Sequence, residues 1–429
     1  MKPINREILS IAVPSIITNI TTPLLALMDV VIVGHMGSAD YIAAIAVGGT
    51  IFNMLYWLFA FLRMGTSGLT AQAHGAADSN ESSLVLARGL SVAFAASAAM
   101  LLFSGLILRF AIEILEVRGA VAEMVREYYT ILIWGAPASL ATFVLTGWFL
   151  GLKEARIPMW ISFIINITNI AVSLLLVFVF GMKVRGVACG TLAAQWTGFI
   201  VGICIVALKF RPRPASWKEI FRTEELKRFF SVNIDIFFRT LCLIAVTVWF
   251  TRTGSTQGTV ILAINTLLMQ FFILFSYFMD GFAFAGEALC GNCIGSRDRE
   301  KLKITIKALF RWSVLMVAVF TAVYAVGGEG IMSLLSDDRD VILSSKEFYS
   351  WVIAIPAVGF AAFTWDGIFI GATKTREMLI SIASATLVYF GLYTLLFPRL
   401  GNHGLWIAFL SYLLCRGVVL TLLRNRIMK

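Results

Sequence analysis

Long apolar stretches recur along the chain and are separated by short polar segments. Each stretch approaches the roughly 20 residues that an α-helix needs to cross the hydrocarbon core of a bilayer. The pattern predicts an all-α integral membrane protein with twelve transmembrane helices. The spans are expected at residues 8–34, 41–62, 89–112, 128–150, 158–180, 186–208, 230–251, 259–284, 308–327, 348–371, 378–397 and 403–423.

A long polar connector at residues 209–228 divides the predicted spans into two groups of six. It contains Arg-Pro-Arg-Pro followed by a charged stretch, a composition that ends helices and favours an exposed segment. We therefore expect an N-terminal lobe at residues 1–208, a cytoplasmic linker at 209–229 and a C-terminal lobe at 230–429.

The two groups of spans are related by an internal repeat. When the second half is laid over the first, Glu127, Gly147, Gly151 and Arg156 align in one register with Glu347, Gly367, Gly371 and Arg376. We call this alignment the repeat register. It also places AQAHGAAD, in the predicted loop after span two, on GNCIGSRD after span eight. Because each copy holds an even number of spans, both copies have the same orientation in the membrane. We expect two pseudo-symmetric six-helix lobes related by an axis along the membrane normal.

Composition and charge exclude a soluble protein and indicate an orientation. Of the 429 residues, 59% are hydrophobic and 14% are charged, too few charges to cover a soluble surface. The loops on the side of the two termini hold 23 Lys and Arg residues, and the opposite loops hold nine. Since basic residues accumulate in cytoplasmic loops, we expect both termini in the cytoplasm of a bacterial inner membrane protein. The net charge of +10 then faces anionic membrane lipid, so we reject nucleic-acid binding.

Asp29 is the only acidic residue in the predicted spans of the first lobe. Ionisable side chains inside a membrane are rare and mark functional sites by default. A carboxylate there can take up a proton, or can bind Na⁺ where neutral oxygens converge on it. The alternative is an aspartate near the outer end of its helix, because Gly34 follows five residues later. Pro14 is expected to break the same helix half-way along.

Neutral polar residues of the fifth and sixth predicted spans are candidates to surround Asp29. Asn166, Asn169 and Ser173 are spaced by three and four residues, which places their side chains on one helical face. Thr191 of the sixth span could join them. Hydrogen bonding between helices is the alternative role for the two asparagines.

The second lobe holds more ionisable residues, among them Arg416 in the last span. Those that are candidates for substrate binding or charge relay are Asp235, Arg239, Asp280, Glu287 and Asp366. Asp235 and Arg239 are one helical turn apart, so they could form an ion pair that only fixes helix packing. Asp280 and Asp366 each precede a glycine in an aromatic-rich stretch, which suits a carboxylate that faces a cavity.

Other chemistries find little support in the sequence. The three histidines are unclustered, and no GxxxxGK[ST] sequence for nucleotide binding occurs. We therefore expect neither an enzyme nor a bound cofactor, and we infer that an ion gradient drives the protein.

Several motifs make the chain similar to the multidrug and toxic compound extrusion (MATE) family, and within it to the DinF-like branch. They extend over nearly the whole length: IAVPSI with MDVVIVGHMG, AQAHGA, FLGLKEARIPM, NITNI, NIDIFFRTLCL, MDGFAFAGEALCG, WDGIFIGATKTREM and GNHGLWIAFL. The resemblance implies a twelve-helix, two-lobe exporter that alternates between outward- and inward-open states. It also implies that Asp29 is the coupling carboxylate and that the first helix bends at Pro14.

One position departs from the family pattern. Members commonly carry a second aspartate four residues after the asparagine that corresponds to Asn169, and this chain has Ser173 there. The missing charge weakens a Na⁺ site formed by Asp29, Asn169 and Thr191. The missing charge favours H⁺ as the coupling ion, or a coupling site that lies in the second lobe instead of the first.

Together, the sequence and the resemblance predict a secondary active multidrug exporter. It would exchange amphipathic, hydrophobic or cationic small molecules for H⁺ or Na⁺ by alternating access, as a monomer in membrane lipid. The alternative is a flippase for lipid-linked precursors with a similar two-lobed architecture, which would have a basic central cavity. Few Lys or Arg residues lie in the middle of the predicted spans.

Overall fold

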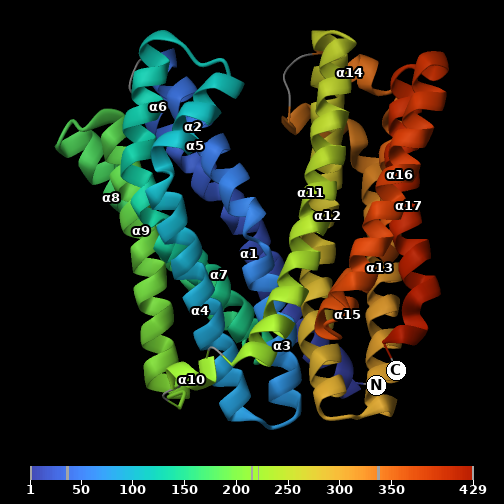
Figure 1. Ribbon diagram of the computed structural model, residues 1–429. Helices are drawn as coiled ribbons and strands as arrows, with labels where there is room; N and C mark the ends of the chain where they lie inside the picture. Colours follow the sequence, from blue (N-terminus) through green and yellow to red (C-terminus); the bar gives the residue numbers. More distant parts are fainter. Residues whose placement is uncertain (1, 35–37, 214–215, 221, 336–338, 428–429) are drawn as a thin grey trace. The chain divides into compact units, whose positions relative to one another are not determined.

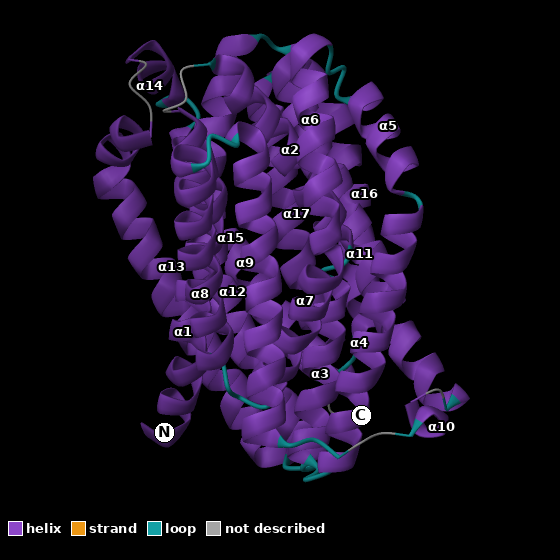
Figure 2. Cartoon of the chain, turned by 90° about the vertical axis from the view of Figure 1, so that its left-hand side faces the viewer, coloured by secondary structure: helices purple, strands orange, loops and turns teal. Residues whose placement is uncertain are grey.

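The computed structural model describes residues 2–34, 38–213, 216–220, 222–335 and 339–427. Within these residues, twelve helical stretches are long and apolar enough to cross a membrane, which confirms the predicted number. Short loops join the helices, and no strand occurs in the described ranges (Figure 2). The chain is therefore a multi-pass, all-α membrane protein.

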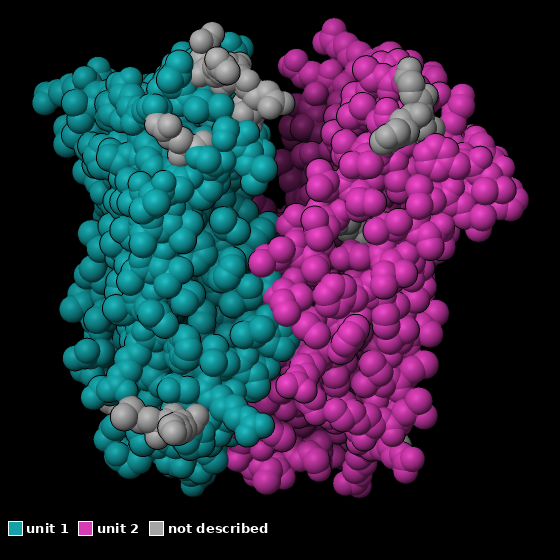
Figure 3. All heavy atoms as spheres, turned by 180° about the vertical axis from the view of Figure 1, so that it is seen from behind, with its two compact units in different colours: residues 1–16, 231–429 teal, residues 17–230 magenta. Residues whose placement is uncertain are grey.

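The chain forms two compact units, which Figure 3 shows in two colours. We call residues 17–230 the N-unit, and residues 1–16 together with 231–429 the C-unit. The sequence places residues 1–16 in the N-terminal lobe, whereas they pack with the second half. The segment expected as a linker, 209–229, groups with the first half. Residues 214–215 and 221 of that segment lie outside the described residues.

The first helix, α1 (Lys2–Gly34), contributes to both units. The N-unit continues with α2 (Ala39–Leu58), α3 (Phe61–Gly75), α4 (Ser79–Leu102), α5 (Ser104–Ile114), α6 (Gly119–Leu132), α7 (Ala136–Gly151), α8 (Arg156–Leu174), α9 (Lys183–Ile205) and α10 (Trp217–Ile220). Three short segments, η1 (Ile133–Gly135), η2 (Leu175–Val179) and η3 (Val206–Phe210), adjoin α7, α8 and α9. Figure 1 labels α1 to α10, coloured from blue to yellow-green.

The C-unit consists mainly of α11 (Thr223–Thr256), α12 (Thr259–Gly295), α13 (Arg299–Leu335), α14 (Arg339–Ser345), α15 (Tyr349–Gly371), α16 (Thr375–Leu400), α17 (Asn402–Leu423) and η4 (Arg424–Arg426). Its core is rich in aromatic rings. For example, Phe271 meets Tyr324 edge to face, with ring centroids 5.1 Å apart. Such contacts stabilise an interior that is apolar throughout.

The helix junctions of the two units repeat in detail. Ala77 and Arg297, which are equivalent in the repeat register, both adopt a left-handed backbone with φ of 57°. The residue after each is an aspartate whose Oδ1 accepts a hydrogen bond from the backbone three residues later, at 2.8 Å for Asp78 and 2.9 Å for Asp298. This N-cap satisfies an otherwise unpaired backbone N–H at the start of a helix. The same device thus starts α4 and α13.

Two glycines permit close helix packing at equivalent places. A Cβ atom on Gly147 of α7 would overlap the carbonyl oxygen of Arg63 in α3, and one on Gly367 of α15 would overlap that of Ala283 in α12. The two glycines are equivalent in the repeat register, and so are the two residues they pack against. The packing confirms the two pseudo-symmetric lobes.

Two local expectations differ from the structure. The sequence places AQAHGAAD and GNCIGSRD in loops, but α3 extends to Gly75 and α12 to Gly295, so both motifs lie mostly in helices. Hydropathy detects the apolar part of a helix and misses small polar residues that continue it. Helix α1 also runs unbroken through Pro14, although the sequence predicts a break there.

Candidate functional site

A buried carboxyl group, that of Asp29 in α1, lies between two other helices of the N-unit. The Nδ2 atom of Asn169 in α8 donates to Asp29 Oδ1 at 3.1 Å. The hydroxyl of Thr191 in α9 lies 3.2 Å from the other carboxylate oxygen, Oδ2. Asp29 is 3% exposed, so its side chain does not lie at an open helix end. The structure thus brings together Asp29, Asn169 and Thr191.

The Thr191 hydroxyl has more neighbours than it has hydrogens. It accepts from Asn169 Nδ2 at 3.0 Å, and it lies 3.0 Å from the carbonyl oxygen of Val187, one turn earlier in α9. A hydroxyl carries one hydrogen, so it can donate either to Val187 or to Asp29, but not to both at once. The hydrogen-bond pattern therefore has two states.

Ser173 lies one turn beyond Asn169 in α8 and is fully buried. A Cβ atom on Gly190 of α9 would overlap the Ser173 hydroxyl oxygen, so a glycine is needed for this close approach of the two helices. The Ser173 hydroxyl and the Asn169 Oδ1 atom make no hydrogen bond to any described residue. Asn166 instead donates to the Thr21 carbonyl oxygen at 3.1 Å.

Tyr128 of α6 also belongs to the cluster around Asp29, although the sequence does not predict this residue as part of the site. It is 3% exposed and interacts electrostatically with Asp29. Gly48 of α2 makes room for it, because a Cβ atom there would lie 2.5 Å from the tyrosine ring. The sequence places Tyr128 at the edge of the fourth span, where an aromatic residue is typical of the membrane interface.

At two of the corresponding positions the C-unit carries aromatic side chains. In the repeat register, Asp29 corresponds to Trp249 and Ser173 to Tyr393. These two rings meet edge to face with centroids 5.9 Å apart. The fold therefore does not require a carboxyl group at this place, and Asp29 has no acidic equivalent in the C-unit.

The C-unit has a different buried charge cluster, centred on Asp366 of α15. Its Oδ2 atom accepts hydrogen bonds from Arg239 of α11 at 2.5 Å and from Arg416 of α17 at 2.6 Å. All three side chains are at most 10% exposed. Arg239 thus pairs with Asp366 and not with Asp235, the partner that helical spacing predicts. Asp235 accepts a hydrogen bond from the Thr375 hydroxyl at 2.9 Å.

The remaining acidic candidates lie on α12. Asp280 is half-buried and interacts electrostatically with Arg416, so it adds negative charge to the cluster around Asp366. Glu287 is 1% exposed, and its backbone carbonyl oxygen would meet a Cβ atom on Gly371 of α15. No group of three or more His, Cys, Asp or Glu residues in the described ranges has the arrangement of a metal site.

The sequence model of the MatE family matches the chain twice, over residues 14–175 and 234–393. The chain belongs to the MatE family. The two matches start at equivalent positions of the repeat register, so each lobe matches the family model separately. As a MatE protein it is a transporter and not an enzyme.

Known MatE relatives cover almost the whole chain. DNA damage-inducible protein F of Escherichia coli (strain K12) is 37% identical over 423 residues, which is 97% of this chain and 91% of the relative. A crystal structure of MATE in the bent conformation has a TM-score of 0.87 at 19% identity and covers 99% of this chain and 95% of its own. A crystal structure of a Vibrio cholerae MATE transporter reaches the same TM-score at 14% identity, with 99% and 97% coverage. These structures support the MatE fold.

Proposed function

We propose that this MatE transporter exports hydrophobic or cationic small molecules across the bacterial inner membrane in exchange for protons, by alternating access. A relative in Idiomarina loihiensis, named "Probable multidrug resistance protein NorM", is 23% identical over 443 residues, which is 96% of this chain and 92% of the relative. Its name supports this substrate class over a lipid-precursor flippase. The excess of basic residues on the side of the termini supports a cytoplasmic location for both ends.

The observation that carries the proposal is a single buried carboxyl group surrounded by neutral partners. Asn169, Thr191 and Tyr128 are the neighbours of Asp29 described above, and none carries a charge. One proton therefore neutralises the whole cluster. Ser173 supplies no second negative charge to hold a metal cation.

The orientation of Asn169 favours H⁺ over Na⁺ as the coupling ion. Its amide nitrogen, a hydrogen-bond donor, faces both Asp29 and Thr191. A Na⁺ ion needs several oxygen atoms directed toward it, in addition to the carboxylate. The amide would have to turn over before its oxygen could serve as such a ligand.

The two states of the Thr191 hydroxyl give protonation a structural consequence. When Asp29 is ionised, Thr191 donates to Asp29 Oδ2. When Oδ2 is protonated, the carboxyl group donates to the Thr191 oxygen, and the threonine hydrogen turns to the Val187 carbonyl oxygen. Loading a proton thus reverses one hydrogen bond between α1 and α9.

Pro14 provides a point where α1 can respond. Proline lacks a backbone N–H, so the helix misses one hydrogen bond there and bends more easily. The boundary between the two units follows directly, between Ile16 and Ile17. We propose that a change in the bonds of Asp29 alters the bend of α1 at Pro14.

The test uses the purified protein in lipid vesicles that contain ethidium, a fluorescent organic cation. An imposed pH gradient should drive ethidium transport by the wild type, and Asp29→Asn should lower the rate at least tenfold. Asp40→Asn serves as the matched control, because Asp40 is an exposed acid at the start of α2. Ethidium binding, followed by fluorescence polarisation, should persist in both variants.

Wild-type rates in Asp29→Asn would contradict the proposal and would direct the search for the coupling group to Asp366 or Glu287. If a Na⁺ gradient drives transport and a pH gradient does not, the coupling ion is Na⁺ and not H⁺.

A further inference from the structure

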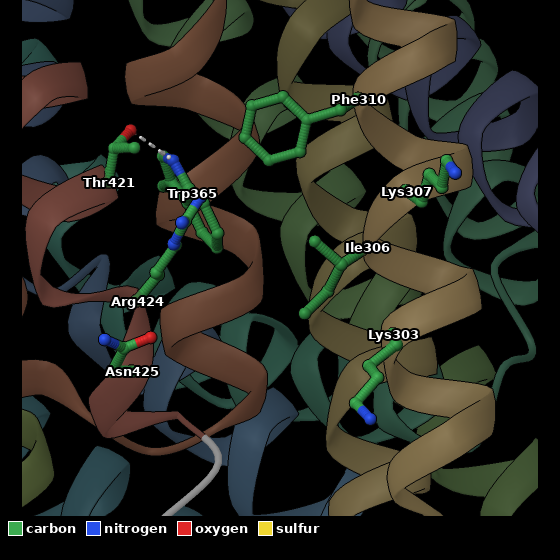
Figure 4. A pocket seen from close by; sticks show the side chains of 8 residues that line it. All are labelled: Lys303, Ile306, Lys307, Phe310, Trp365, Thr421, Arg424 and Asn425. Atoms are coloured by element: carbon green, nitrogen blue, oxygen red, sulfur yellow. Dashed lines mark hydrogen bonds between the residues drawn. The ribbon is translucent and has the colours of Figure 1, made fainter.

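A cavity of about 380 Å³ lies in the C-unit and shares no residue with the cluster around Asp366. It lies between α13, α15 and the end of α17 with η4 (Figure 4). Part of its lining is apolar and part is positively charged. Two aromatic side chains form one wall, and three basic side chains line the cavity together with Ile306, Thr421 and Asn425.

The aromatic wall is well ordered by its own contacts. Phe310 of α13 meets Trp365 of α15 with ring centroids 4.9 Å apart. The indole nitrogen of Trp365 donates to the Thr421 hydroxyl at 2.8 Å, as Figure 4 shows. Because the polar atom of the indole is already paired, the ring offers the cavity an apolar surface.

The basic side chains are Lys303 and Lys307 of α13 and Arg424 of η4. Lys303 donates to Glu300, one turn earlier, at 2.8 Å. Lys307 and Arg424 form no ion pair with any described residue. No acidic residue lines the cavity within the described ranges. The cavity therefore has an excess of positive charge.

The order of these residues along α13 corresponds to a change from membrane surface to membrane interior. The helix starts at Arg299, and Lys303 and Lys307 lie in its first turns, whereas Phe310 lies deeper. At about 1.5 Å per residue, Phe310 is roughly 10 Å further along the helix than Lys303. A phospholipid shows the same order, with its charged headgroup at the surface and its acyl chains below.

The internal repeat indicates that these charges are not needed for folding. In the repeat register, Lys303, Lys307 and Trp365 correspond to Ser83, Ala87 and Leu145 of the N-unit. The helices pack alike in both units without the basic groups. Their presence in one unit alone points to a ligand.

We propose that this cavity binds an anionic phospholipid from the surrounding bilayer. The headgroup phosphate lies at Lys307 and Arg424, and an acyl chain packs on Phe310 and Trp365. Basic pockets between transmembrane helices are suited to anionic headgroups, since each Lys or Arg near the surface adds attraction. A free phosphate ion would use the basic groups alone and leave the aromatic wall unused.

The experiment measures lipid binding to the purified full-length protein in an uncharged detergent, by native mass spectrometry. Phosphatidylglycerol and phosphatidylcholine with the same acyl chains are compared. The wild type should bind phosphatidylglycerol about 25-fold more tightly, since each of the two cations contributes about fivefold. The double variant Lys307→Ser/Arg424→Ser should lose about fivefold in phosphatidylglycerol affinity for each cation removed, with phosphatidylcholine binding unchanged.

The matched control is Arg376→Ser, which removes an exposed basic residue of α16 that does not line the cavity. It should retain the lipid preference, as should the charge-preserving variant Lys307→Arg/Arg424→Lys. Equal affinity for the two lipids overturns the proposal, as does an unchanged preference in the double serine variant. Displacement of the lipid by millimolar inorganic phosphate would identify a site for soluble anions and would also overturn it.

Discussion

Asn265 of α12 and Asn402 of α17 exchange two side-chain hydrogen bonds, each amide donating to the oxygen of the other, at 2.8 and 2.9 Å. Both residues are buried in the C-unit. Each amide group uses its N–H₂ as a donor and its oxygen as an acceptor within the pair. Neither asparagine therefore leaves its amide nitrogen or oxygen without a hydrogen bond in an apolar interior.

This reciprocity predicts a measurable coupling energy. In a double-mutant cycle, Asn265→Ala and Asn402→Ala should show an interaction of about 1 kcal/mol, near the range found between membrane helices. Unfolding in a mixed detergent series provides the measurement. Asn265→Ala combined with Asn53→Ala, an exposed residue of α2, should be additive. Additivity of the Asn265 and Asn402 changes would mean that the pair contributes nothing specific.

Ser173→Asp should convert the ion preference of the exporter. The substitution places a second carboxylate in the cluster of Asp29 and Asn169, so two negative charges would favour a bound cation over a single proton. Vesicles with opposed pH and Na⁺ gradients should show at least a tenfold gain in Na⁺-driven ethidium transport. Ser173→Asn, of similar size without the charge, is the control. A gain in both variants, or in neither, would argue that charge at this position does not select the ion.

Asp366→Asn should destabilise the C-unit strongly, because Arg239 and Arg416 would lose their shared carboxylate while still buried. Removing one partner of a buried ion pair costs about 3–5 kcal/mol. Asp235→Asn is the comparison, and it should cost about 1 kcal/mol, since Asp235 accepts one bond from a neutral hydroxyl. Thermal unfolding of the purified variants measures both. Similar losses for the two aspartates would contradict the central position of Asp366.

Arg88→Gln should release the short helix α10. The buried Arg88 guanidinium donates to the carbonyl oxygens of Ile220 and Glu219 at 3.2 and 3.3 Å, and pairs with Glu81 at 2.8 Å. It thereby caps the C-terminal end of α10, where a positive charge is favourable.

Limited digestion with proteinase K tests this contact, with cleavage near residue 220 expected at least fivefold faster in Arg88→Gln. The control, Arg185→Gln, removes a surface ion pair with Glu127 elsewhere in the N-unit. An unchanged digestion pattern in Arg88→Gln would show that α10 is held by other contacts.

The sequence predicts what depends on local composition and misses what depends on contacts between distant helices. Twelve spans follow from apolar length alone, and the repeat from matching glycines. The second span is interrupted at Phe59 and Ala60, between α2 and α3. The sequence does not predict this interruption, because neither residue is a proline or a glycine.

The partner of Arg239 illustrates the same limit. Helical spacing singles out Asp235, four residues away, while Asp366 lies 127 positions further along the chain. Arg239 and Asp366 meet only because α11 lies next to α15 in the folded protein. Tyr128 is missed for a similar reason, because its place beside Asp29 depends on how α6 packs.

The assignment of residues 1–16 to the C-unit has a consequence for biosynthesis. A Cβ atom on Gly281 would lie 2.9 Å from the Ala12 carbonyl oxygen, so the start of the first helix packs on α12, which is made only in the second half of synthesis. At about 10 residues per second, the ribosome needs roughly half a minute to supply that partner. During this time residues 1–16 of the first helix lack the contact with α12 that they have in the complete protein. Residues 17–230 are made before α12 and form one contiguous unit, whereas residues 1–16 can reach their final packing only after α12 has been made.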